Sequence, residues 1–300
     1  MRRMYEGPID EKILFLGSIM MMLLAACSTH ESSKEDHKSK SNQNNVQKAK
    51  KNESDKKDET SSTNTSKLST KERLALAFCI DGVDQYTLTK NEILTGIYEY
   101  RLPTGKHNYK LVDFTLVKMK QPVKHAPKHM QFFTVYPDKS TYQALIGVNK
   151  DTVYVGRMQK GTLDYNDLLD KGKEASLEEV YKHNKDNKAL PELISKMHIS
   201  NALPDSANDK GNPLASNDLE KSGSVNTRYR NEVYQLISDF DEVELKKSGY
   251  LWDDVKMTDH NGNWIVNYRN KKGEILGTYR TKHGKIQKLD EKGNIVNEEK

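Results

Sequence analysis

The side chains of this chain best suited to acid–base chemistry or metal binding are a few histidines and one acidic cluster. His125 and His129 are four residues apart, which on a helix would put both rings on one face. Pro127 lies between them, and because proline disrupts a helix interior, the segment is predicted to be a solvated loop. A surface metal site is the alternative. His107 and the cluster Asp164–Asp170 are the other residues from which the fold could assemble an enzyme site. The aspartates of this cluster do not have the spacing of a calcium-binding loop.

No recognised catalytic motif accompanies these residues. The sequence contains no glycine-rich phosphate loop with lysine, no Gly-x-Ser-x-Gly, no His-Glu-x-x-His and no paired-cysteine motif. Ser54 and Lys57 match a Ser-x-x-Lys pattern, but they lie in a stretch predicted to be disordered, which favours a chance match. We therefore predict no catalytic residue, no metal site and no cofactor, and the prediction leans away from an enzyme.

The two cysteines have different surroundings. Cys79 lies in the apolar run Leu74–Ile80 and is predicted to be a buried small hydrophobic residue; a catalytic thiol is the alternative and would need a histidine partner. Cys27 ends Leu24-Ala25-Ala26-Cys27, which resembles a bacterial lipobox. The resemblance implies cleavage between Ala26 and Cys27 and lipidation of the Cys27 thiol, which becomes the mature N-terminus.

The segment before Cys27 supports this interpretation. The apolar run Ile13–Leu24 is shorter than the roughly 20 residues of a membrane-spanning helix, so residues 1–26 are predicted to be a signal peptide. The first twelve residues are charge-balanced rather than positive, which leaves open whether the start is Met1 or Met4. Two or more acyl chains on one cysteine would give stable membrane attachment.

Residues 27–68 are predicted to form a disordered tether. Between residues 28 and 67 only Val46 and Ala49 are aliphatic, too few to offset the entropy of ordering the chain. The net charge of the whole chain is +5, with Lys and Asp or Glu interspersed. This pattern argues against nucleic acid as a partner and leaves a cell-wall polymer or an envelope protein as partners beside the lipid bilayer.

The remainder is predicted to be α+β, with two small domains built on antiparallel sheets. Residues 69–200 form the first domain, in which Ser69 and Glu72 have the spacing of a helix capping box. The predicted strands of this domain are 93–100, 109–119, 132–136, 142–148 and 152–157, and the predicted helices after them are 165–169, 176–183 and 192–197. Residues 201–224 are predicted to be a linker.

Residues 225–300 are predicted to be a helix packed on a β-meander. The apolar face of this helix is expected to carry Tyr229, Val233, Leu236, Ile237 and Phe240. Three Gly-x-Ile repeats, which begin at Gly273, Gly284 and Gly293, are each expected to open a short strand. The sheet side of the core is expected to carry Trp252, Trp264, Tyr268 and Tyr279.

Two stretches, residues 67–77 and 83–96, are similar to a family of uncharacterised lipoproteins from Gram-positive, in particular staphylococcal, bacteria. The resemblance implies a lipid-anchored protein at the cell membrane that faces outside the cytoplasm, and it implies no site residues. Together with the missing motifs, it predicts a non-enzymatic binding or accessory protein of the cell envelope. The alternatives are an envelope hydrolase whose site only the fold assembles, and a solute-binding lipoprotein, which would need two α/β lobes.

Overall fold

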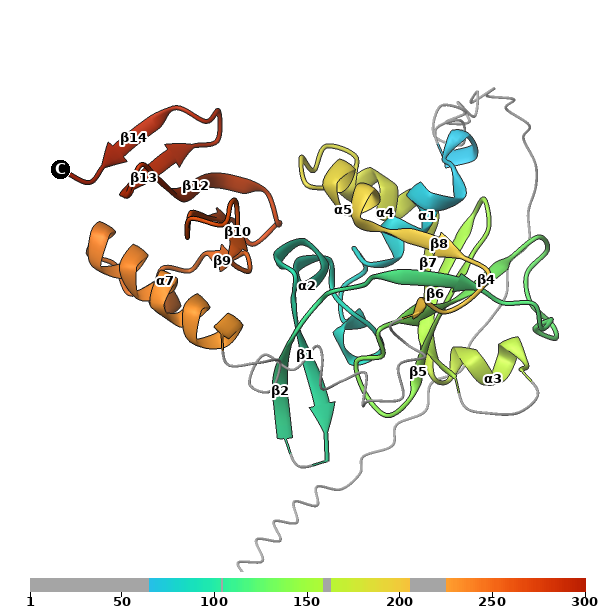
Figure 1. Ribbon diagram of the computed structural model, residues 1–300. Coiled ribbons are helices and arrows are strands. Elements are labelled where there is room, and N and C mark those ends of the chain that lie inside the picture. The colour runs from blue at the N-terminus through green and yellow to red at the C-terminus, as the bar shows by residue number, and fades with distance from the viewer. Residues whose placement is uncertain (1–64, 104, 159–162, 206–224) are drawn as a thin grey trace, which may run out of the picture. The chain divides into compact units, whose positions relative to one another are not determined.

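The computed structural model describes residues 65–103, 105–158, 163–205 and 225–300, and all of these belong to one compact unit. The predicted signal peptide, Cys27 and nearly all of the tether lie outside the described residues, as does most of the linker. The fold is α+β with two sheet-based bodies, as predicted (Figure 1). Short 3₁₀ turns are present at Thr65–Lys67, Val83–Gln85 and Leu245–Lys247.

The first body is built on a six-stranded sheet in the order β7-β6-β5-β4-β3-β8. In that order the strands are Gly172–Ser176, Thr152–Met158, Gln143–Val148, Gln131–Tyr136, Thr115–Lys118 and His198–Ser200. All pairings are antiparallel except β3 with β8, which is parallel. The β5–β6 hairpin turns at 149–151, as predicted. The sequence did not predict β7 and β8, because both are short and mostly polar or exposed.

Both faces of this sheet are covered by helices, because apolar residues occupy successive positions of its central strands. Phe133 and Ile146 face a core shared with α1 (Thr70–Ala77), α4 (Leu177–Asn184) and α5 (Leu190–Lys196). Phe132 and Leu145, one residue along each strand, face a smaller cluster with α3 (Tyr165–Leu169). This alternation follows from the two-residue period of a strand. Figure 1 shows α3 on the opposite side of the sheet from α1, α4 and α5.

The segment that precedes this sheet differs from the prediction in two places. The predicted strand 93–100 begins as helix α2 (Lys90–Thr95), and β1 (Ile97–Leu102) starts only after Gly96 in a left-handed conformation. Thr89 and Glu92 form a capping box, the same device that was predicted and is present at Ser69 and Glu72. The predicted strand 109–119 is divided into β2 (Gly105–Lys110), which pairs with β1, and β3.

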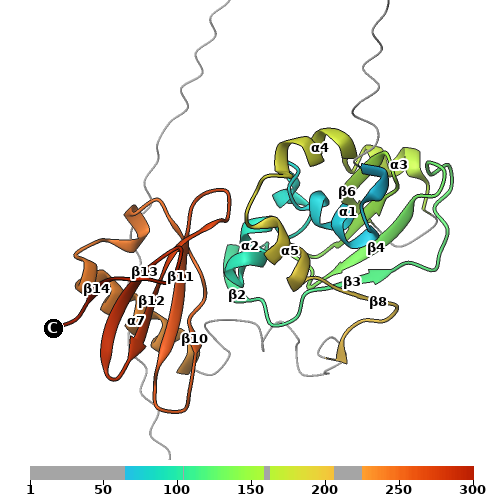
Figure 2. The same cartoon turned by 90° about the horizontal axis from the view of Figure 1, so that it is seen from above.

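The second body is a helix on a meander, as predicted. Helix α7 (Val225–Asp241) packs on a sheet whose main order is β10-β11-β12-β13-β14, with β9 paired to β11 (Figure 2). From β9 to β14 the strands are Leu251–Trp252, Lys256–Met257, Trp264–Arg269, Ile275–Lys282, Lys285–Asp290 and Ile295–Glu298. The glycines of the three repeats have positive φ, as their turns require. One expected core position is wrong: the Leu236 side chain is 46% exposed, whereas Val233 and Ile237 of the same helix are buried.

A buried ion cluster joins the two bodies. The Arg269 guanidinium, 1% exposed, donates to both carboxylate oxygens of Asp253 (2.6 and 2.8 Å) and to both of Glu192 on α5 (2.7 and 2.9 Å). Its Nη1 also donates to the Gly273 carbonyl at 2.9 Å. Because all of these acceptors surround a side chain that water barely reaches, this cluster fixes the β9–β11 end of the second body against α5.

Candidate functional site

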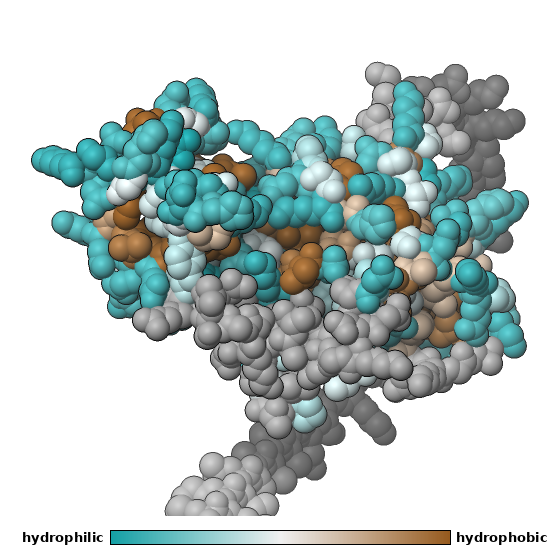
Figure 3. Space-filling model, in the orientation of Figure 1, coloured by the Kyte–Doolittle hydropathy of each residue, from teal (hydrophilic) through white to brown (hydrophobic). Residues whose placement is uncertain are grey.

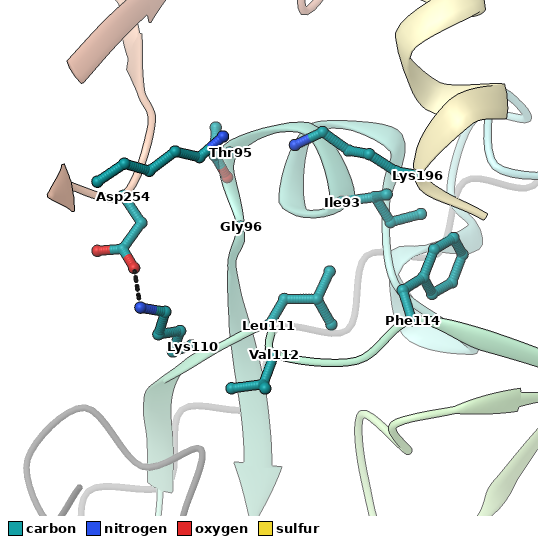
Figure 4. Close-up of a pocket in the computed structure, with 10 residues that line it drawn as sticks. Ile93, Thr95, Gly96, Lys110, Leu111, Val112, Phe114, Lys196 and Asp254 are labelled. Carbon is teal, nitrogen blue, oxygen red and sulfur yellow. Dashed lines mark ion pairs between the residues drawn. The ribbon is translucent and has the colours of Figure 1, made fainter. Parts of the chain in front are cut away.

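The candidate site is a pocket of about 200 Å³ that adjoins this ion cluster (Figure 4). Residues from α2, from β2 and the loop after it, from α5 and from the β9–β10 segment line it. Its volume is below the roughly 300–1,000 Å³ of pockets for drug-sized ligands. A small molecule, or the end of a larger one, is therefore what the pocket can accept.

The floor of the pocket is apolar. Ile93, which is 1% exposed, and Phe114 are core residues whose outer edges reach the pocket. Leu111 and Val112 continue this surface, and Val112 at the rim is 58% exposed. In the view of Figure 3, apolar residues reach the described surface in patches among hydrophilic ones.

Three lysines and a single carboxylate make up the charged part of the lining: Lys110, Lys196, Lys256 and Asp254. The Lys110 ammonium lies 3.5 Å from the Asp254 carboxylate, as the dashed line in Figure 4 marks. One of the three positive charges is thus balanced within the lining. The pocket therefore combines an apolar floor with an excess of positive charge.

Lys196 is the most constrained of these cations. Its Nζ donates to the Leu94 carbonyl at 2.8 Å and lies 3.5 Å from Glu192. Burial, reinforced by the charge of Lys256 and opposed by that of Glu192, lowers the pKa of Lys196 below that of a free lysine. A nearby opposite charge favours the charged form of a buried ammonium, so an anionic ligand in the pocket would stabilise the charged form of Lys196.

Asp254 keeps the pocket wall in place. Its backbone N–H donates to the Thr95 carbonyl at 2.8 Å, which ties the β9–β10 segment to the end of α2. Its carboxylate lies near Arg230 of α7 (3.8 Å) as well as Lys110. Since Lys110 and Arg230 share this one carboxylate, Asp254 offsets at most one of the three lysine charges that line the pocket.

The structure brings together only some of the sequence-predicted candidates. The His125 Nδ1 lies 2.8 Å from the Asp164 carboxylate. Asp164 also caps α3 by accepting from the Asn166 N–H, and this bond, together with that from His125, lowers the pKa of Asp164. The pair thus fastens the β3–β4 loop to the start of α3, in an irregular segment as Pro127 indicated.

The other candidates lie apart from this pair. His129 lines a different pocket, described below, and His107 is a β2 residue opposite Tyr100 of β1. Within the described ranges, no group of three or more His, Cys, Asp or Glu side chains is arranged to hold a metal ion. Ser54, Lys57 and Cys27 lie outside those ranges.

Cys79 behaves as a packed residue. It contacts the main core, its Sγ donates to the Ala75 carbonyl at 3.7 Å, and burial raises the pKa of its thiol to about 11. A thiol with such a pKa is almost fully protonated near neutral pH. The interpretation as a small hydrophobic residue therefore fits the structure.

The residues of the pocket were not singled out from the sequence. Lys110, Lys196 and Asp254 are far apart in the chain and belong to elements of both bodies, so no local pattern connects them. The only local signal was the capping box at Thr89 and Glu92, which would have placed α2 and with it one wall.

No protein-family model, curated protein or solved structure matches this chain. Among the residues that the structure describes, no helix combines the length and the apolar character needed to cross a membrane.

Proposed function

We propose that the chain is a lipid-anchored, extracytoplasmic binding protein of the cell envelope, with Cys27 as its anchor. The lipobox-like Leu24-Ala25-Ala26-Cys27, the short apolar run before it and the polar stretch after it support the anchor. The resemblance to Gram-positive lipoproteins supports the same location. No catalytic role is included in the proposal.

The pocket of Figure 4 is the observation that carries the binding function. Its apolar floor favours a small hydrocarbon group, and its cationic side favours one negative charge beside that group. The ligand class is therefore a small carboxylate with an aliphatic side chain, such as the C-terminal residue of a peptide. A charge-assisted hydrogen bond to Lys196 would contribute about 1.5–3 kcal/mol to binding.

Substitutions at Val112 test the pocket with a matched pair of variants. N-acetyl-leucine serves as the probe, and its binding to the full chain carrying Cys27→Ala is followed by amide chemical shifts. Because Val112 is 58% exposed, Val112→Asp and Val112→Lys should leave the fold intact. Val112→Asp should weaken binding at least tenfold, by about 1.4 kcal/mol, whereas Val112→Lys should preserve it. Equal affinity of the two variants would refute the assignment of the site.

The anchor is tested separately in cells. Cys27→Ala should remove the protein from the membrane fraction and leave it unprocessed or in the medium. The matched control is Cys79→Ala, which should remain in the membrane fraction because Cys79 is a partly buried residue that packs against the core of the first body. If Cys27→Ala fractionates with membranes as the wild type does, the anchor is wrong, whatever the pocket binds.

A further inference from the structure

A second pocket, of about 590 Å³, lies on the first body and shares no residue with the first. It is formed by α1, by the β3–β4 loop and by the tight β5–β6 turn. Its lining includes the polar residues Arg73, Lys128, His129, Gln131, Lys150 and Thr152. It is nearly three times as large as the first pocket, so it can hold more than one unit of a chain-like ligand.

The charges of this pocket are predominantly positive. Arg73, Lys128 and Lys150 line it, and Asp151 is the one acidic residue among the described residues of the lining. Asp151 lies 3.5 Å from the Lys150 ammonium, and both side chains are about two-thirds exposed, so solvent weakens that pair. Lys150 is therefore still available to an anionic ligand, together with Arg73 and Lys128.

Arg73 has hydrogen-bonding capacity that the protein does not use. Its Nη2 makes one long bond, 3.4 Å, to the Ser66 carbonyl, and its buried Nε has no hydrogen-bond partner among the residues that the structure describes. A guanidinium is a planar set of donors that suits the oxygens of a phosphate group. Gln131 and Thr152 add neutral polar groups that suit hydroxyls.

The loop and the turn are tied to each other before any ligand arrives. The Asn149 side chain accepts from the N–H groups of Asp151 and Thr152 (2.9 and 2.7 Å) and donates to the Lys128 carbonyl at 3.3 Å. His129, next in the loop, is held at φ 61°, a left-handed conformation that is uncommon for residues other than glycine. Lys128 and Lys150 therefore lie on a loop and a turn that are already ordered, which lowers the entropy cost of binding.

We propose that this pocket binds the phosphodiester groups of a soluble polyol phosphate polymer. Guanidinium and ammonium groups supply the phosphate contacts, while the amide and hydroxyl of Gln131 and Thr152 serve the polyol. A polymer is favoured over a lipid headgroup because, among the described lining residues, only Pro127 and Val148 have wholly apolar side chains that an acyl chain could contact. The proposal does not depend on the lipid anchor or on the first pocket.

The test titrates the full chain carrying Cys27→Ala with poly(glycerol phosphate) and follows amide chemical shifts and affinity. The amides of residues 128–131 and 148–152 should shift. Lys150→Glu should weaken binding about tenfold, whereas Lys150→Arg should bind within about twofold of the wild type. Both variants should have the melting temperature of the parent chain, because the Lys150 side chain is 71% exposed.

Two further arms separate phosphodiester chemistry from charge alone and polymer from lipid. Polyglutamate of equal charge should bind at least tenfold more weakly, and vesicles of phosphatidylglycerol should not compete with the polymer. Equal binding of polyglutamate, identical affinities of Lys150→Glu and Lys150→Arg, or binding to the vesicles alone would each overturn the proposal.

Discussion

Replacing Arg269 should loosen the attachment of the second body more than any change on its surface. In Arg269→Met the side-chain volume is largely kept, but Asp253, 3% exposed, loses two charge-assisted hydrogen bonds. Removing one partner of a buried ion pair typically costs about 3–5 kcal/mol, because the remaining charge is left without compensation. For a unit of this size each kcal/mol lowers the melting temperature by about 2–4 °C, so a decrease of roughly 6–20 °C is expected.

The control and the rescue variant make this prediction specific. Arg280→Met, on neighbouring strand β12, removes one hydrogen bond to the neutral Gln287 and should cost only about 0.5–1.5 kcal/mol. Adding Asp253→Asn to Arg269→Met should recover part of the loss, because the unpaired buried charge is then removed. The assay is thermal and urea unfolding of the wild type and these three variants. A loss below about 1 kcal/mol for Arg269→Met, or no recovery in the double variant, would refute this account of the cluster.

The same cluster predicts an acid dependence. Burial opposes ionisation of Glu192, but the hydrogen bonds and charge of Arg269 outweigh it and hold the pKa of Glu192 below its usual range. A carboxyl whose pKa is lower in the folded state stabilises the fold above its unfolded pKa, and this contribution is lost as the pH falls through the lowered value. Glu192→Gln should therefore flatten the acid side of the stability curve, and an unchanged curve would contradict the pairing.

Three further variants or measurements test other parts of the structure. Gly273→Ala should destabilise clearly more than Gly284→Ala, because both glycines have positive φ but only at Gly273 would a Cβ lie 2.5 Å from a Leu94 methyl group; equal losses would contradict this packing. Burial raises the pKa of Asp138 to about 6, so folding favours its protonated form and stability should fall as the pH rises from about 4 to 6. Asp138→Asn should then gain about 1–3 kcal/mol over the wild type at pH 7 and lose that gain below pH 4, as urea unfolding at the two pH values would show. Cys79 should resist iodoacetamide at pH 8 until the chain unfolds, and mass mapping that finds rapid labelling in the folded protein would refute its burial.

The sequence predicted those parts of the fold that local signals control. The capping box at Ser69, the 149–151 hairpin and the glycine turns of the meander each depend on a few adjacent residues, and each is present. Helix α2 was missed because the β-branched and aromatic residues after Ile93 outweighed the capping signal that begins at Thr89.

The candidate site could not be predicted in the same way. Whether Lys196 comes to line the same pocket as Asp254 depends on how α5 packs against the second body, and no periodicity encodes that packing. The exposed Leu236 is a similar case. Helical spacing predicts which residues of α7 form its apolar face, but not which of those residues the sheet buries.

Two ligands that differ only in whether they end in a carboxylate or a neutral amide test the pocket as an anion-binding site. N-acetyl-leucine and N-acetyl-leucinamide are titrated against the full chain carrying Cys27→Ala, and the amide shifts around Ile93–Gly96 and Leu111–Val112 are followed. We expect the carboxylate to bind about 10- to 140-fold more tightly than the amide, because one charge-assisted hydrogen bond contributes about 1.5–3 kcal/mol. Equal affinities, or shifts that avoid these residues, would contradict a cationic pocket with an apolar floor as the binding site.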